Sequence, residues 1–424
     1  IVFDRPIDPG SVDGDVMQIT PDLAGTLEVV VLPGEDAGEP VTGRVLRFTP
    51  SGPLPPNTTF DVQVAPGVVA AAGGGGLAQP LSWSFTTGAP SATLSNQITF
   101  LSDRSGVANV WSMNPDGTGQ HPVSAELAAI LDYAVAPDGS SLIVADGRRL
   151  IFLRADGGDR RVITGGEHWE FDPTYAPSGR VVAFGRADAT SGDGLGLWQW
   201  EVGAGDPQPI ELPDETSAGP APSASDEEAP LLLRAPRYSP DGLALAFVDA
   251  SGSVGLLELP AQRLTRVPFA AAAPPAWLPD SSAVLLGGTP PDASGELAPL
   301  AAPVERLEPG AGDAVHRLAR SGTSTRETAL GTGWRVLAVA GEGTIAFATD
   351  RGGLGTTDDE DATDGPLLVE DALVIGAAFA PGEEAMVIVA ADEGATVGSI
   401  VRLDLATGER TALATEGWLP RWLP

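Results

Sequence analysis

Short stretches of alternating apolar and polar residues run through the whole chain, separated by turn-forming residues. In the first part such runs lie at 27–32, 44–48, 60–64 and 81–86, bounded by Pro, Gly and Asp. A period of two residues is that of a strand with one buried face. Short strands at this spacing predict an all-β sandwich of about 90 residues. We place it at residues 1–90.

From residue 97 onward an internal repeat dominates the pattern. Each copy has an aromatic residue, a short turn built on Pro and often Asp-Gly, and then an alternating apolar run. The copies contain Tyr133, Tyr175, Tyr238, Trp277, Phe379 and Trp422. Most neighbouring copies lie about 40 residues apart, the length of a four-stranded propeller blade. A degenerate copy is predicted near 336–348, inside the longest gap.

The two ends of this array complement each other. Residues 98–101 begin a blade without an innermost strand, and residues 418–424 form an innermost strand with nothing after it. Pairing them completes one blade and removes two exposed sheet edges. We therefore predict a closed β-propeller over 97–424 with seven blades, six being the alternative.

Composition excludes several classes of protein. The chain has 24 Arg, no Lys and 57 Asp or Glu, a net charge of −33, which argues against a nucleic-acid partner. The 53 Gly and 39 Pro interrupt the chain too often for long helices. The absence of Cys rules out disulfides, thiolate metal sites and a cysteine nucleophile.

The phrases of the first segment carry a family resemblance. The opening FDRPIDPG, the middle LPPNTTF and the end WSFTT supply the motif residues Phe3, Pro6, Asp8, Pro9, Leu54, Pro56, Thr58, Phe60, Trp83, Phe85 and Thr86. Together they resemble the bacterial Ig-like domain of surface-layer and secreted proteins. The resemblance implies a spacer or adhesive module whose first strand is missing.

The second segment has its own resemblance. The runs FLSDRSG at 100–106 and WSMNPDG at 111–117 look like TolB-type propeller repeats, and the similarity extends over 97–424. Propellers of that type usually count six blades, which keeps the alternative blade number open.

Four insertions lengthen the loops of the repeat, at 187–195, 213–231, 289–312 and 352–365. We expect all four on the same face of the ring, where long loops on a rigid scaffold often bind partners. The acidic run Asp226, Glu227 and Glu228 is a candidate for partner binding, and a flexible linker is the alternative.

A second acidic loop is the candidate cation site. Carboxylates of Asp358, Asp359, Asp361 and Asp364 cluster beside a glycine, as Ca²⁺ ligands often do. The alternative is a solvated acidic loop. Asp188 and Asp193 are better explained by an Asx turn than by a cation.

Arg237 and Arg421 precede aromatic residues at equivalent repeat positions, so they are predicted to border the central channel. They would receive an anionic ligand or pair with nearby Asp residues, and pairing is the favoured interpretation. His121, His168 and His316 fall in different blades, and no nucleophile motif is present. We therefore predict no catalytic residues and no organic cofactor.

These patterns predict a non-enzymatic, exported binding or scaffold protein with a protein partner. The alternatives are a structural subunit of a surface layer and a glycan-active propeller enzyme that uses a metal. We expect an extracellular, cell-surface or periplasmic location. Because Ile1 reads as part of a strand, upstream residues are expected, and a signal peptide or membrane anchor could have been among them.

Overall fold

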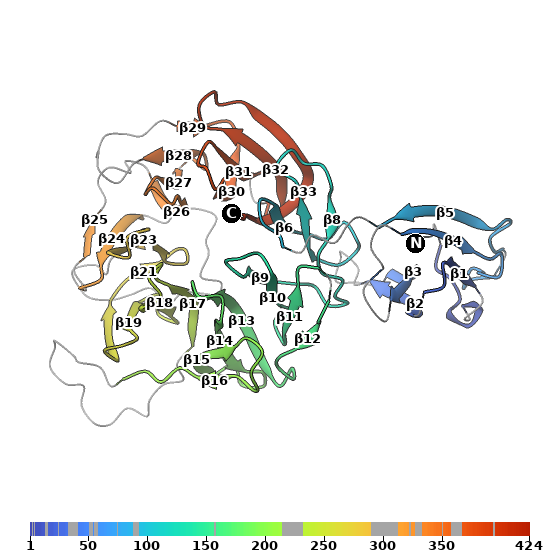
Figure 1. Cartoon of the computed structure of the whole chain (residues 1–424), viewed down its shortest axis with the longest axis horizontal. Helices are drawn as coiled ribbons and strands as arrows, with labels where there is room; N and C mark the ends of the chain where they lie inside the picture. Colours follow the sequence, from blue (N-terminus) through green and yellow to red (C-terminus); the bar gives the residue numbers. More distant parts are fainter. Residues whose placement is uncertain are drawn as a thin grey trace. The chain divides into compact units, whose positions relative to one another are not determined.

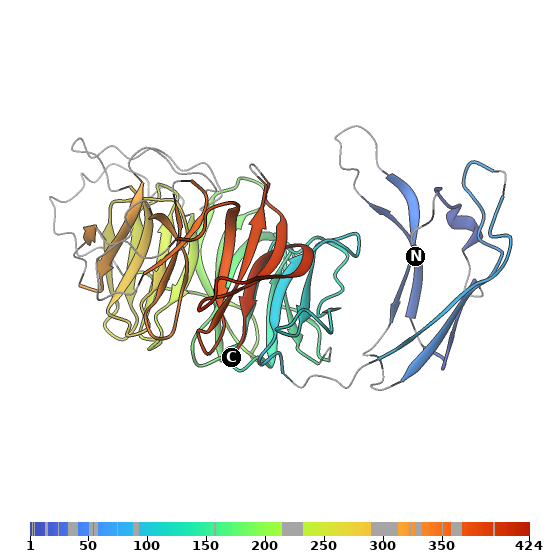
Figure 2. The same cartoon turned by 90° about the horizontal axis from the view of Figure 1, so that it is seen from above.

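The computed structural model describes most of the chain in two compact units, whose boundary in the sequence falls between Ala92 and Thr93. Figures 1 and 2 show both units in two views, and each is treated separately below. The described residues are 1, 3, 5–12, 16–23, 25–32, 41–50, 54, 58–73, 75–87, 93–156, 158–213, 232–289, 313–321, 324–326, 333–349, 351–357, 367–392 and 395–424.

The N-terminal unit is built from two small antiparallel sheets. One has the order β1-β4-β5 and the other pairs β2 with β3. The elements are the 3-10 turn η1 (Pro9–Ser11) and the strands β1 (Met17–Thr20), β2 (Gly25–Leu32), β3 (Val41–Pro50), β4 (Thr59–Val64) and β5 (Leu81–Thr86). Ile7, Val16, Leu46, Val64 and Val68 form the buried core. Alternation along β4, whose every second residue is buried, follows the sequence pattern.

The C-terminal unit is a β-propeller of antiparallel sheets arranged around a centre (Figure 1). Its first three sets of strands are β6 (Ile98–Ser102), β7 (Asn109–Met113) and β8 (His121–Pro122); β9 (Asp132–Val135), β10 (Ser141–Ala145), β11 (Leu150–Arg154) and β12 (Arg161–Val162); and β13 (His168–Tyr175), β14 (Val181–Asp188), β15 (Gly194–Glu201) and β16 (Gln208–Pro209).

The remaining sets follow in sequence order. They are β17 (Leu233–Tyr238), β18 (Ala244–Asp249), β19 (Val254–Glu258) and β20 (Arg263–Val267); β21 (Ala270–Ala271), β22 (Ala276–Trp277), β23 (Ala283–Thr289), β24 (Ala314–Ala319) and β25 (Ser324–Arg326); β26 (Gly333–Val339), β27 (Ile345–Thr349), β28 (Leu354–Thr357) and β29 (Leu367–Val369); and β30 (Leu373–Phe379), β31 (Ala385–Ala391), β32 (Gly398–Asp404) and β33 (Arg410–Trp422).

Apolar side chains between neighbouring sheets form the core of the propeller. Ile143 of β10 and Phe152 of β11, for example, share a buried cluster with Val182 and Phe184 of β14. Each sheet is thus covered on both faces, which explains why second strands such as β10 are buried at every residue. No helix in the described part of the chain is long and apolar enough to cross a membrane.

Strand β33 belongs to two sets of strands. Its first half pairs with β32, and its second half pairs with β6, where Arg421 faces Thr99 and Trp422 faces Ile98. This is the pairing between residues 418–424 and 98–101 that the repeat predicts. Because β33 joins both sets, β30 to β33 and β6 to β8 form one seven-stranded sheet, and the number of blades stays a prediction.

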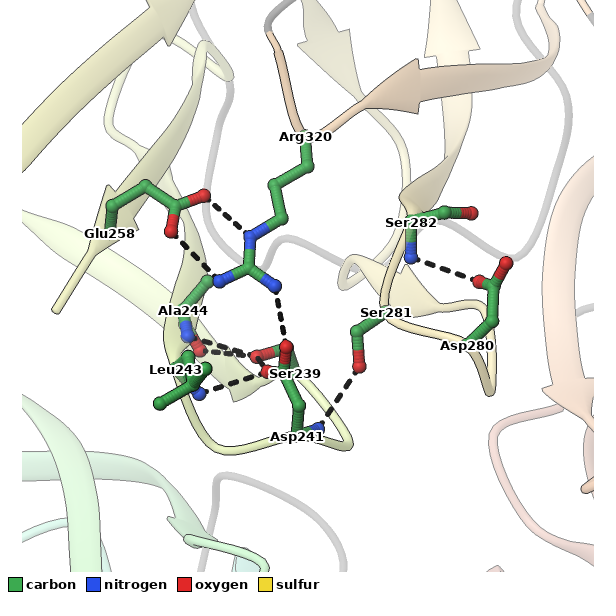
Figure 3. Close-up of polar contacts among 9 residues, drawn as sticks. All are labelled: Ser239, Asp241, Leu243, Ala244, Glu258, Asp280, Ser281, Ser282 and Arg320. Atoms are coloured by element: carbon green, nitrogen blue, oxygen red, sulfur yellow. Dashed lines mark hydrogen bonds and ion pairs between the residues drawn. The ribbon is translucent and has the colours of Figure 1, made fainter. Parts of the chain in front are cut away.

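Ion pairs add to the apolar contacts between sheets. Arg320, just after β24, donates to Asp241 in the turn between β17 and β18 at 2.6 Å (Figure 3). Ser281 Oγ, from the β22–β23 turn, accepts from the backbone N of Asp241 at 3.0 Å. Two neighbouring sheets are therefore held together by their turns as well as by their faces.

The prediction that four insertions share one face is wrong. Within residues 187–195, β14 ends at Asp188 and β15 begins at Gly194, so only the short turn 189–193 connects the two strands. Residues 352–365 contain β28, whose last residue Thr357 lies beside Ile345, the first residue of β27. The chain therefore leaves β28 on the face opposite to the β23–β24 and β16–β17 connections. Residues 214–231 and 290–312 lie outside the described residues.

Candidate functional site

The innermost strands surround two cavities. Strands β9, β13, β17, β26, β30 and β33 contribute to the larger one, of about 600 Å³, which we call the exit cavity because it lies where these strands end. A second cavity of about 310 Å³, the entry cavity, is lined by residues near the starts of β9, β13 and β17, together with Leu419 and Arg421 in the last part of β33. Both volumes lie in the range of small-ligand and peptide side-chain pockets.

Arg237 and Arg421 line both cavities, so they lie between them along the channel. The register of their strands makes them equivalent, since Arg237 faces Ala246 and Arg421 faces Thr99 on the respective second strands. The equivalent residues of four other inner strands are small and also line the exit cavity: Ala134, Thr174, Ala338 and Ala378. Two long cationic side chains thus border a space that small neighbours leave open.

Arg421 uses few of its five N–H donors within the described residues. Its Nη2 donates to the carbonyl of Tyr133 at 2.8 Å, and its guanidinium carbon lies 5.1 Å from the centre of the Tyr133 ring. The nearest carboxylate oxygen, on Asp132, is 3.9 Å from Nη2. The Nε atom is buried and has no hydrogen-bond partner in the described part of the chain. Arg237 donates from Nη1 to the carbonyl of Pro236 at 2.9 Å.

Asp132 is the acidic group nearest to Arg421. Its Oδ1 accepts a hydrogen bond from the backbone N of Tyr133 at 2.7 Å. Burial raises the pKa of Asp132 to about 6, against the opposing charge of Arg421, while Asp172 raises it further and Arg237 lowers it. The side chain keeps 22% of its exposure because it borders the entry cavity. Asp132 therefore titrates close to neutral pH.

Asp172 lies at the equivalent place on β13 and has a firm partner. It accepts from Arg234 Nε at 2.7 Å, from Arg234 Nη2 at 3.1 Å and from the backbone N of Ala235 at 2.8 Å. Burial alone would raise the pKa of Asp172, but the hydrogen bonds and charge of Arg234 outweigh it and lower the pKa. Asp172 therefore remains ionised and fastens β13 to β17.

The same local distortion recurs on three inner strands. Asp172, Ala235 and Leu419 have φ of 55°, 49° and 48°, each precedes a proline, and each lies within a shift of register. Proline cannot donate to the ladder, so the strand accommodates an extra residue as a bulge there. Left-handed backbone at non-glycine residues is strained, and such strain often lies at binding sites.

A buried ion pair completes the entry cavity. Glu170, which lines it, is 1% exposed and binds Arg186 at 2.9 Å. Burial raises the pKa of Glu170 to about 7, although the hydrogen bond from Arg186 opposes this. The guanidinium carbon of Arg186 also lies 3.9 Å from the centre of the Trp198 ring. Glu170 and Arg186 thus bind each other, and the pair fixes the position of β13 and β14 at the wall of the cavity.

The structure describes only some of the predicted site residues. It brings Arg237 and Arg421 to one channel, but Asp226, Glu227, Glu228, Asp358, Asp359, Asp361 and Asp364 lie outside the described residues. Asp188 accepts from the backbone N of Thr190 and Ser191, an Asx turn as predicted. Within the described segments, no three or more His, Asp or Glu are grouped to hold a metal ion.

Three residues of the channel were missed by sequence reasoning: Asp132, Asp172 and Arg234. A usable signal was present, because a residue followed by Pro, then Thr or Arg, then an aromatic recurs at 172–175, 235–238 and 419–422. The histidines lie apart: His121 is in β8, His168 in β13 and His316 in β24. His316 is 6% exposed and packs edge-on against Phe269 at 5.3 Å.

Comparison with known proteins agrees with the first sequence resemblance. Residues 1–87 match the family model of the bacterial Ig-like domain. No curated protein matches the chain. The crystal structure of TolB from Acinetobacter baumannii is similar over 97% of this chain and 84% of its own length, with 13% identity and a TM-score of 0.45. The structure of putative TolB from Agrobacterium tumefaciens is similar over 76% of this chain and 90% of its own, with 13% identity and a TM-score of 0.40.

Proposed function

We propose that the chain is a non-enzymatic binding protein of the bacterial cell envelope whose propeller channel receives an acidic segment of a protein partner. The observation that carries the proposal is the position of Arg237 and Arg421, which border both cavities. The Ig-like unit would act as a spacer, a role that its family resemblance supports.

The size of the exit cavity limits what can enter. About 600 Å³ accommodates a few side chains of an extended segment and excludes a folded domain. Small residues around the two arginines leave room for a carboxylate to approach the guanidinium groups. Charge-assisted hydrogen bonds of this kind are about twice as strong as neutral ones.

The remaining charges of the channel make the site selective. Asp172 is occupied by Arg234, so its negative charge is compensated. Asp132 is the carboxylate that competes for Arg421, from 3.9 Å. Because the whole chain carries a net charge of −33, an acidic partner is repelled at long range and accepted only where the two arginines are exposed to it.

The arrangement of the channel supports binding more than catalysis. Acid–base or metal chemistry needs several reactive groups within hydrogen-bond reach of one substrate atom. The three histidines lie in separate sheets, and two of the channel acids, Glu170 and Asp172, are held by arginines, which leaves Asp132 without a second reactive group beside it among the described residues.

The test is capture of partners from an envelope extract by the immobilised chain, with mass spectrometry as the readout. We expect a protein that is retained by the unmodified chain and by Arg263→Ala, a variant at the exposed first residue of β20, but lost from the double variant Arg237→Ala/Arg421→Ala. Poly-L-glutamate should displace it and poly-L-glutamine should not. Equal retention by the double variant would refute the role of the channel.

A further inference from the structure

The outer strand of the N-terminal unit exposes an apolar face. Leu81, Trp83 and Phe85 of β5 are 42%, 39% and 38% exposed. Their cross-strand neighbours on β4, by contrast, are buried; these are Val64, Val62 and Phe60. Directly opposed residues of antiparallel strands share a face, so the exposed side chains lie on the core-facing side of the sheet. Among the described residues, the core therefore ends at β5 without a covering segment.

Strand β5 is also an edge. Among the described residues it pairs only with β4 (Figure 1). Its sequence LSWSFT contains no charged residue and no proline. Natural sheet edges are usually protected by charges, prolines or a covering segment, because an apolar edge recruits another strand. Strand β5 has neither charge nor proline, and no segment in the described part of the unit covers its edge, which indicates that it has a partner strand.

The direction of the main-chain groups on β5 follows from one hydrogen bond. The backbone N of Thr87 donates to the carbonyl of Thr58 at 2.9 Å, so Thr87 directs its main-chain groups toward β4. Along an antiparallel pair this direction alternates at every residue. Ser82, Ser84 and Thr86 therefore direct their N–H and C=O groups toward the open edge.

We propose that β5 pairs antiparallel with β5 of a second copy of this chain, about a two-fold axis through Trp83. In this register Ser82 of each copy exchanges two main-chain hydrogen bonds with Ser84 of the other. Trp83 faces Trp83 of the second copy, and Leu81 faces Phe85 of the second copy. Aromatic and aliphatic pairs of this kind are the usual stabilising pairs of a sheet.

The sequence of β5 favours a copy of itself over an unrelated strand. Centring the axis on Trp83 puts every apolar residue opposite another apolar residue and every serine opposite a serine. A shift of the axis by half a residue would place Leu81 opposite Thr86 and would mix the two faces. A self-complementary patch is the requirement of a two-fold dimer. The dimer would contain one continuous sheet with three strands from each copy. This proposal depends on β5 alone and is independent of the proposal for the propeller channel.

The contact is small, and both copies are strongly negative, so association depends on concentration and on salt. Sedimentation velocity of the unmodified 43.2 kDa chain should show monomer at low and dimer at high micromolar concentration. Raising NaCl should strengthen dimerisation, because salt screens the repulsion between the copies. Ser84→Pro should abolish the dimer without changing thermal unfolding, since this N–H points away from β4.

The absence of Cys allows a test of the register by single cysteines. A pair that lacks main-chain hydrogen bonds has Cα atoms about 4.5 Å apart, within reach of a disulfide. Trp83→Cys should therefore form a disulfide-linked dimer on mild oxidation. Leu81→Cys and Phe85→Cys should each remain mostly uncrosslinked alone and should crosslink when mixed. Val162→Cys, an equally exposed position on β12, is the matched control.

Three results would overturn the proposal. One is a chain that stays monomeric at all concentrations and salt levels. Another is Phe85→Cys crosslinking alone as well as it does in the mixture with Leu81→Cys. The third is slow hydrogen exchange of the Ser82 and Ser84 amides in the monomer, which would show that a segment of the same molecule covers the edge.

Discussion

Arg320 and Glu258 are joined by two hydrogen bonds, from Nε at 2.5 Å and from Nη2 at 2.8 Å, across the boundary between two neighbouring sheets (Figure 3). Glu258 ends β19, and Arg320 follows β24. The third bond, from Arg320 to Asp241, uses the remaining nitrogen. One planar guanidinium therefore binds two carboxylates from the adjacent sheet, a geometry that a lysine cannot reproduce.

Removing this side chain should destabilise the propeller. Arg320→Ala removes both hydrogen bonds to Glu258 and the ion pair with Asp241, which then keeps, among the described residues, only its bonds from Ser239 and Leu243. We expect a loss of about 2 kcal/mol in the free energy of unfolding. Arg320→Lys should recover only part of it. Urea denaturation measures both. Arg410→Ala is the control, because its partner Asp371 is 74% exposed and the pair should contribute nothing measurable.

Asp132 should make stability depend on pH. Its folded-state pKa, about 6, is above the ordinary value of 3.8, so protonation favours the folded state. The stability that this group contributes is complete below about pH 4 and is lost as the pH rises through 6. Asp132→Asn should therefore leave Tm unchanged at pH 4 and raise it at pH 7, where the free energy of unfolding should increase by up to about 3 kcal/mol.

The opposite sign is expected at an exposed turn. Hydrogen bonds from Ser140 lower the pKa of Asp138. Asp138→Asn should accordingly reduce stability at pH 7 and have no effect well below pH 4. If Asp132→Asn and Asp138→Asn shift Tm in the same direction at pH 7, the assignment of Asp132 is wrong.

The bulge on β13 should depend on the chemistry of Asp172. Asp172→Ala removes three hydrogen bonds, leaves Arg234 without its carboxylate and keeps a β-carbon at φ of 55°, so a loss of about 3 kcal/mol is expected. Asp172→Asn should lose less, because Asn tolerates left-handed backbone and still accepts from Ala235. Equal losses would show that the side chain does not support the bulge.

Deleting residues 418–424 should expose the edge of β6. The deletion removes the pairing of Trp418 with Leu101, Arg421 with Thr99 and Trp422 with Ile98. It also uncovers apolar side chains of two core clusters, since Trp422 and Leu423 belong to them. We expect aggregation and a Tm lower by at least several degrees. An unchanged thermal transition would contradict the role of β33 as a shared strand.

Local pattern accounted for most of the propeller strands and for the pairing of β33 with β6. The degenerate copy near 336–348 is present as β26 and β27. One aromatic residue was assigned to the wrong position of the repeat. Tyr133 was grouped with the repeated aromatics, yet Val135 holds that place, since Val135 faces Leu142 as Tyr175 faces Val182. Tyr133 instead donates from its hydroxyl to the carbonyl of Leu419 at 2.8 Å.

Contacts between distant parts of the chain were beyond pattern reading. The partner of Asp172 is Arg234 on the next inner strand, while Arg237, three residues later, has the repeat position that drew attention. The bulge at Asp172, which the repeat positions did not reveal, brings Arg234 and not Arg237 to the aspartate.

The prediction that the four insertions share one face failed because the length of the gap did not reveal that β28 lies inside 352–365. A short strand in an insertion reverses the face on which the rest emerges.

The double membership of β33 has a consequence for how the propeller is made. Arg104 donates to the carbonyl of Glu416 at 3.0 Å, a contact between residues 312 positions apart. During synthesis, β6 to β8 emerge early, and β6 lacks its neighbour β33 until every other strand of the unit has been made. The open side of β6 is meanwhile available to wrong strands. Folding of this unit should therefore depend on a holding factor, or on fast delivery of the whole chain, more than its final stability suggests.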